Sequence, residues 1–379
     1  MVSLLRVALV WATVLSVSLA WTIPHASVIR SLSKRAISLW HNVSPPSPAA
    51  FSQDEVDELN DWLSDSITMA RTARRMLDRY SSDRVVAATL GTFLGVEPID
   101  DNGQFTPKDP AQLQNFKGPD WLGDVVAYAE GGFASFGYSE AWLMKGDSFQ
   151  QRKTLDDWVQ QDDGSVAKFE QNGVEQPISL RQVADFAGEI AKGRWIWWIP
   201  GMGSYLSLGA GDFTPGVPGV SPGSQCTGAG AFTGTTRGLQ GVRKSLITIC
   251  KPGAQGDGTP VDHFSAIPYK MFADVPVTKD AVVEKHFSRS TILLHEMMHA
   301  VRQGKSPDLV NGSDQCFAKR KTGASAVSPA CVTAMVVAMN FLDRGLTAGQ
   351  DPWSFWTGRA RAASEAYEWF VNQKKDQQS

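Results

Sequence analysis

The residues with the clearest chemical potential are His295, Glu296 and His299, which form an H-E-x-x-H pattern inside an apolar run. Residues four apart lie on one face of a helix, so the two imidazoles can hold one zinc ion. Glu296 stands beside them and can take a proton from a water whose pKa the metal lowers to about 7. The pattern predicts metal-assisted hydrolysis of peptide bonds. The simpler alternative is a partly buried helix with two incidental histidines.

The flanking residues predict the helix that would position this pattern. Ser288 or Ser290 can cap its start, and Gly304 followed by Pro307 can end it. Apolar residues on both sides of the pattern predict that the helix packs in a core; they are Ile292, Leu293, Leu294, Met297, Met298 and Val301.

A catalytic zinc site needs a third protein ligand and one open position. The extension H-E-x-x-H-x-x-G-x-x-H is excluded, because Arg302 and Lys305 stand where its glycine and third ligand should be. The other two histidines near the pattern, His263 and His286, are expected to be packed or solvated rather than ligands.

Downstream carboxylates are the remaining candidates for the third ligand. Glu365 is preferred, because it borders the apolar face of a helix expected from about Gly358 to Asn372. Glu368 lies one turn further along that helix. Asp308 and Asp314 are closer to the pattern in sequence but lie on an expected surface loop.

The H-E-x-x-H pattern, a following cysteine-bounded segment and the run A-S-E-A-Y-E-W-F at 363–370 together resemble a known family. It is the aspzincin group, secreted fungal zinc metallopeptidases related to deuterolysin and peptidyl-Lys metalloendopeptidase. Their motif N-A-D-S-Y-x-W/F-F supplies an aspartate as third ligand, so the resemblance implies Glu365 in that role and Tyr367 as a group that stabilises the tetrahedral intermediate. The chain departs at Glu365, at Ala363 in place of asparagine, and in lacking the G-T-x-D-x-x-Y-G motif. The resemblance covers roughly residues 245–372.

The composition and the N-terminal residues predict the compartment in which the protein acts. The 379-residue chain has 20% charged residues and a net charge of −3, which is typical of soluble globular proteins and indicates no nucleic-acid partner. Residues 1–20 have the basic start, apolar core and small residues of a secretory signal peptide. Residues 21–35 would be a short pro-segment that ends at the dibasic pair Lys34-Arg35. We therefore expect a secreted protein with no membrane anchor.

The four cysteines fit an oxidising compartment, in which they should form two disulfides. Three pairings are open, and nearest-neighbour pairing is preferred because it closes the shortest loops: Cys226–Cys250 and Cys316–Cys331. Two glycosylation sequons begin at Asn42 and Asn311.

The expected fold is α+β and zincin-like, with a central H-E-x-x-H helix and a small sheet with an edge strand. Residues 36–200 should form a mainly helical N-terminal region, and residues 201–379 the metallopeptidase domain. The run at 194–200, R-W-I-W-W-I-P, is interpreted as a buried strand rather than a sugar-stacking platform. Residues 201–241 are expected to be loop. The strand Ser245–Cys250 is expected at the sheet edge, where a peptide substrate could pair with it.

Other helices are predicted from local signals. They are a helix capped by Ser52 that extends to about Leu77, a second from about Asp83 to Leu94, a segment at 181–191, and a helix that starts at Ser328-Pro329 and stops at Gly345. Short elements are expected at 120–128 and 148–158.

The sequence therefore predicts a monomeric zinc endopeptidase acting on protein or peptide substrates. Two alternatives remain open. One is a catalytically inactive secreted interaction protein with the zincin fold. The other is a carbohydrate- or cell-wall-binding protein that uses some of the 13 tryptophans.

Overall fold

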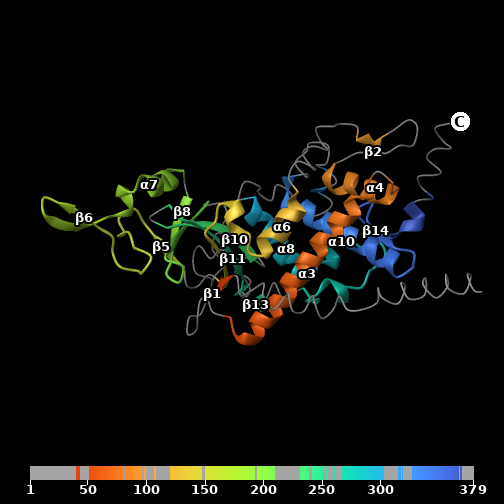
Figure 1. Cartoon of the computed structure of the whole chain (residues 1–379), viewed down its shortest axis with the longest axis horizontal. Coiled ribbons are helices and arrows are strands. Elements are labelled where there is room, and N and C mark those ends of the chain that lie inside the picture. Colours follow the sequence, from red (N-terminus) through yellow and green to blue (C-terminus); the bar gives the residue numbers. More distant parts are fainter. Residues whose placement is uncertain are drawn as a thin grey trace, which may run out of the picture.

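The computed structural model describes residues 40–42, 51–80, 82–95, 98–99, 106–107, 120–146, 150–192, 194–209, 231–238, 241–250, 253–254, 260–261, 267–302, 315–316, 318, 327–366 and 368. Within them the chain is α+β, with α-helices packed beside and against a seven-stranded sheet (Figure 1). The predicted signal peptide and pro-segment lie outside these residues.

The helices carry most of the main core. The α-helices are α3 (Gln53–Leu77), α4 (Arg84–Leu94), α6 (Trp121–Ala129), α7 (Ala184–Ala191), α8 (Arg289–Val301) and α10 (Pro329–Thr347). The 3-10 helices are η2 (Phe133–Phe136), η3 (Leu180–Gln182), η5 (Phe272–Asp274) and η6 (Val283–His286).

The large sheet has the strand order β1-β4-β11-β10-β9-β8-β5. Its strands are β1 (His41–Asn42), β4 (Glu140–Lys145), β5 (Gln151–Lys153), β8 (Arg194–Ile199), β9 (Ser204–Gly209), β10 (Ala231–Arg237) and β11 (Arg243–Ile249). β4 runs parallel to β1 and β11, and the other pairs are antiparallel. Four two-stranded pairs complete the described strands: β2 (Pro98–Ile99) with β3 (Thr106–Pro107), β6 (Lys168–Gln171) with β7 (Val174–Pro177), β12 (Gly253–Ala254) with β13 (Pro260–Val261), and β14 (Trp353–Ser354) with β15 (Arg361–Ala362).

Local signals explain where the helices begin and end. Ser52 and Glu55 form both hydrogen bonds of a capping box at the start of α3, as predicted. Asp83 accepts from two backbone N–H groups at the start of α4, and Gly95 ends it in the left-handed conformation that glycine tolerates best. Ser328-Pro329 starts α10 as predicted, although that helix continues past Gly345 to Thr347.

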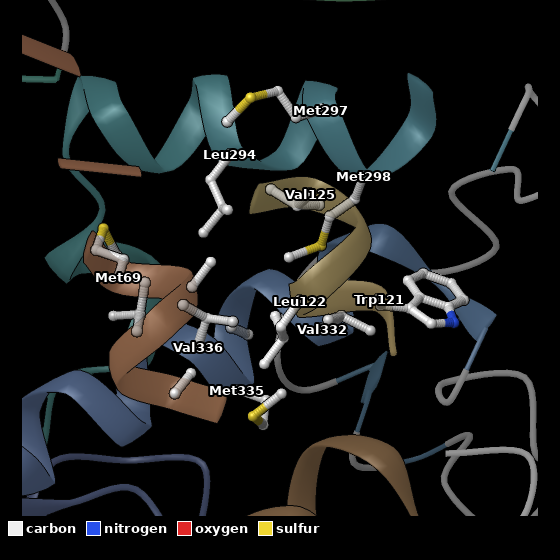
Figure 2. Packing of buried hydrophobic residues seen from close by; sticks show 14 of the residues in the cluster. Met69, Trp121, Leu122, Val125, Leu294, Met297, Met298, Val332, Met335 and Val336 are labelled. Carbon is white, nitrogen blue, oxygen red and sulfur yellow. The ribbon is translucent and has the colours of Figure 1, made fainter. Parts of the chain in front are cut away.

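Helices α3, α6, α8 and α10 pack around one apolar centre (Figure 2). Labelled side chains from all four converge there, among them Met69 of α3, Val125 of α6, Leu294 of α8 and Val336 of α10. Polar bonds also cross this core. Ser66 Oγ donates to the main-chain oxygen of Ser290 at 2.7 Å. Buried bonds of this kind fix the register of two helices, because a shift would leave a donor or acceptor without its partner.

The end of the sheet formed by β5 and β8 extends away from α3, α4 and α10 (Figure 1). Here β8, β9 and α7 contribute Trp198, Tyr205 and Phe186 to a separate apolar cluster. β5 pairs with β8, and β6 and β7 form a hairpin. Trp197 and Trp198 are buried, which confirms the interpretation of 194–200 as a core strand.

The predicted edge strand was wrong. β11 lies inside the sheet, paired with β10 on one side and β4 on the other. Its unbroken run of buried residues is typical of a strand covered on both faces, and this explains its central place. The expected loop at 201–241 was also wrong in part, because it contains β9 and β10; residues 210–230 lie outside the described residues.

Two further expectations failed near the ends of regular elements. The expected helix from Gly358 is replaced over its first turn by β15, and helical residues begin only at Ala363. The expected boundary between residues 200 and 201 falls in the tight connection of the β8–β9 hairpin. Residues 36–200 contain α3, α4, α6 and α7, but they also supply β1, β4, β5 and β8 to the same sheet as β9–β11, so this region is not a domain separate from residues 201–379.

The described cysteines agree with nearest-neighbour pairing. Cys316 and Cys331 form a disulfide that joins the segment after α8 to the first turn of α10. Cys250 is also disulfide-bonded, and its predicted partner Cys226 lies outside the described residues. In the part of the chain that the structure describes, no helix combines the length and apolar character needed to cross a membrane.

Candidate metal centre

Helix α8 is fixed at its N-terminus by a buried hydroxyl network. Ser288 is the N-cap and exchanges hydrogen bonds with Thr291, as one of the two predicted caps. Ser290 Oγ donates to the carboxylate of Asp65 on α3, which also accepts from the Phe272 N–H at 2.7 Å. Burial raises the pKa of Asp65, since it disfavours the charged form. These contacts join α8 to α3 and η5.

The two sides of α8 have different surroundings. Leu294, Met297 and Met298 are fully buried, and Leu294 and Met298 point toward the neighbouring helices (Figure 2). His295 and His299 are partly exposed on another face, as the four-residue spacing predicts. Glu296 lies between the histidine face and the sheet and is buried, with 5% of its surface exposed.

The two histidine rings converge on one point. Their Nε2 atoms are 3.2 Å apart, and the ring planes meet at 76°. Two nitrogens bound tetrahedrally to one zinc at 2.0–2.1 Å would be about 3.3 Å apart. The pair therefore fits one zinc ion with little movement. Without metal, the same distance allows one imidazole N–H to donate to the other ring.

Strand β10 supplies the polar contact to Glu296. The hydroxyl of Thr233 lies 2.8 Å from Glu296 Oε2 and 2.9 Å from the main-chain oxygen of the same residue. In the segment between η2 and β4, the Tyr138 hydroxyl donates to the main-chain oxygen of Ala300 at 2.9 Å. Burial raises the pKa of Tyr138, so this donor keeps its proton. These contacts join α8 to β10 and to the segment before β4.

Sequence reasoning missed both of these contacts. Thr233 lies in the segment A-F-T-G-T-T-R, whose glycine and threonines were interpreted as loop. The signal that could have found it is the alternation of Thr233 and Thr235, which places both hydroxyls on one face of a strand. Tyr138 carries no motif, and only the fold brings it to the end of α8.

The predicted third ligand lies in a different setting. The Glu365 carboxylate forms ion pairs with Lys279 at 3.1 Å and Arg361 at 3.7 Å. Glu368 is exposed. Tyr367, Asp308 and Asp314 lie outside the described residues. Among the residues that are described, no group of three or more His, Cys, Asp or Glu side chains is placed to hold a metal ion. The structure thus brings His295, Glu296 and His299 together, but not Glu365.

His286 is a packing residue, as predicted. Its ring is 1% exposed and lies edge-on to Phe341 and Phe355. Nε2 accepts from the Thr278 N–H at 3.1 Å, and Nδ1 lies 3.1 Å from the main-chain oxygen of Val282. Burial lowers its pKa, because the charged imidazolium is disfavoured among aromatic rings. His263 lies outside the described residues.

Comparison with known proteins found no matching family model, no matching curated protein and no matching solved structure.

Proposed function

We propose that this protein is a secreted zinc-dependent endopeptidase with a zincin-like arrangement, in which His295 and His299 are zinc ligands and Glu296 is the general base. The observation that carries the proposal is the 3.2 Å separation of the two histidine Nε2 atoms on a partly exposed face of α8, next to a buried glutamate. Bound zinc would supply a Lewis acid and lower the pKa of the attacking water. Glu296 would take a proton from the attacking water and pass it to the leaving amine.

The edge of β10 supports a peptide as substrate. β10 pairs with β11 along its whole length, but with β9 only through Thr236 and Arg237. Over 231–235, the other edge of β10 has no strand partner within the described ranges. An extended peptide could add there by main-chain hydrogen bonds, beside Glu296. β10 therefore takes the substrate-binding role that the sequence had suggested for the strand at 245–250.

The third zinc ligand needs a separate test. Glu365 balances two cations, so its release toward a metal would leave Lys279 and Arg361 without that partner. Asp308 and Asp314 lie between α8 and Cys316, on the chain that leaves the histidine helix. We propose to measure bound zinc in single alanine variants of Glu365, Glu368, Asp308 and Asp314, with Glu170→Ala in the β6–β7 hairpin as the control. The variant that loses zinc while remaining folded identifies the ligand. Tyr367→Phe, in turn, tests the oxyanion role that the resemblance implies.

Secretion is supported by the disulfide chemistry. The Cys316–Cys331 bond and the disulfide-bonded Cys250 fit an oxidising compartment, together with the signal-like residues 1–20. The burial of Trp197 and Trp198 gives no support to a carbohydrate-binding platform at 194–200.

The decisive experiment is digestion of a mixed peptide library by the purified protein, with Glu296→Gln beside it. We expect chelator-sensitive cleavage by the wild type and a loss of about 100-fold to 10,000-fold in the variant, because a general base contributes that much. Glu296→Gln should keep its zinc, since Glu296 is not a ligand. The exposed Glu170 in the β6–β7 hairpin provides the control, and Glu170→Gln should cleave normally.

Two outcomes would contradict the proposal. Full activity in Glu296→Gln would remove the general base. A wild-type protein that carries stoichiometric zinc and cleaves no peptide would favour the inactive interaction protein.

A further inference from the structure

We infer that Thr233 is the positioning residue of the general base: its hydroxyl holds the Glu296 carboxylate in the orientation needed to receive a proton. This inference rests on the proposed peptidase function. Neither the H-E-x-x-H pattern nor the resemblance to a family assigns a role to any residue of β10.

The contact joins one donor to two acceptors of the same residue. Thr233 Oγ1 is 2.8 Å from Glu296 Oε2 and 2.9 Å from the Glu296 main-chain oxygen. A hydroxyl carries one proton, so it donates to one of these oxygens at a time. The charged oxygen is the stronger acceptor. The main-chain oxygen, fixed in α8, keeps the hydroxyl next to the carboxylate.

A buried glutamate needs such a partner. Glu296 has three side-chain torsions, and its 5% exposure leaves little water to hold the carboxylate. A displacement of about 1 Å at a reacting group can cost on the order of 100-fold in rate. A single hydrogen bond from a rigid neighbour therefore has a large effect on the rate.

Strand β10 gives Thr233 that rigidity. Thr233 is opposite Ile247 within the continuous β10–β11 ladder, so its backbone is fixed by the sheet. Its β-branched side chain has few rotamers. Thr233 also lies within 231–235, the stretch where a substrate strand could pair. The main chain of Thr233 thus lies at the edge of β10 where a substrate could pair, and its hydroxyl holds the proposed base, Glu296.

Thr235 provides a matched control. It lies two residues further along β10, and its hydroxyl is 3.3 Å from the Tyr138 hydroxyl. Alternation places it on the same face as Thr233. Thr→Val at either position removes one hydroxyl but keeps the shape of the side chain and the main chain that would pair with a substrate, so a general effect on β10 would appear in both variants.

The kinetic test compares Thr233→Val, Thr233→Ser and Thr235→Val with the wild type on one library-selected peptide. We expect Thr233→Val to lower kcat by about 10-fold to 100-fold with KM within about 2-fold, because it disturbs the base and not substrate binding. Thr233→Ser should recover most of kcat, and Thr235→Val should lose little. All variants should bind zinc equally.

A second test needs neither zinc nor activity. Thr233→Val and Glu296→Ala break the same hydrogen bond, so their combined shift in the unfolding midpoint of the metal-free protein should be smaller than the sum of the two shifts. Thr235→Val combined with Glu296→Ala should be additive.

The outcomes distinguish a failure of the Thr233 inference from a failure of the proposed peptidase function. No cleavage by zinc-loaded wild type would overturn both. An active wild type with an unchanged kcat in Thr233→Val would overturn the inference alone, as would a Thr233→Ser variant as slow as Thr233→Val. Additive midpoint shifts for Thr233→Val and Glu296→Ala would also overturn it, because they would show that the two groups do not interact.

Discussion

The two sides of α8 show how one helix separates stability from chemistry. On the core side, Leu294 and Met298 are fully buried and point toward α3, α6 and α10 (Figure 2). On the other side, His295 and His299 face outward and meet each other. The buried side fixes the helix axis, and the outward side then presents two imidazoles at a set distance. Changes on the two sides should therefore have different effects.

The histidines show a similar contrast between burial and exposure. His286 packs against Phe341 of α10 and is buried, whereas His295 and His299 are partly exposed. The neutral imidazole of His286, packed against phenylalanine rings, contributes to packing and hydrogen bonding. The two partly exposed imidazoles lie close enough to fit the proposed zinc ion. The same residue type thus has two roles, and the surroundings decide between them.

The largest expected effect is on metal binding. His299→Ala removes a proposed zinc ligand, so zinc affinity should fall by more than the 10-fold to 100-fold typical of losing a group that only supports a ligand. Zinc content after dialysis against a weak chelator measures it. His286→Gln is the control and should retain its zinc. Loss of zinc from His286→Gln, with retention in His299→Ala, would reverse the roles assigned to these two histidines.

A smaller effect is expected on the core side. Leu294→Ala leaves a cavity between the helices and should lower the free energy of unfolding by about 2–5 kcal/mol. Chemical denaturation gives the value, and zinc binding by the folded fraction should be unchanged. Leu346→Ala, at a position on α10 with 38% exposure, should cost less than about 0.5 kcal/mol. Equal costs at the two sites would contradict the assignment of the core.

The smallest effect is a pH dependence from His286. Its pKa is lowered in the folded protein from the ordinary 6.5, so the unfolded chain binds more protons as the pH falls through that range. The stability linked to neutral His286 is present in full above pH 6.5 and is lost as the pH falls toward the folded-state pKa. Unfolding curves of the wild type and His286→Gln at a series of pH values should converge under acid conditions. A parallel course of the two curves would exclude His286 as the source.

The sequence predicted the elements that depend on local signals. Ser52 with Glu55, Asp83 with Gly95, and Ser328 with Pro329 each mark a helix end that the structure confirms, because caps act within one turn. The histidine pair followed from helical spacing alone.

The sequence did not predict what depends on distant partners. β9 and β10 contain serine, threonine and glycine, and their strand character comes from pairing with β8 and β11. The central position of β11 depends on β4, which is far away in the sequence. The Thr233–Glu296 contact is nonlocal in the same way, which is why the candidate base was predicted and its partner was not.

The disulfide between Cys316 and Cys331 has a consequence for producing the protein. Both cysteines are fully buried, and the bond closes a loop with a sequence separation of 15. Closing a loop of that length contributes about 3 kcal/mol in the chain-entropy view, against a total stability of about 5–15 kcal/mol for a typical protein. A bacterial cytoplasm would keep the two thiols reduced and remove that contribution. Expression in an oxidising host is therefore expected to decide whether any zinc or activity measurement starts from folded material.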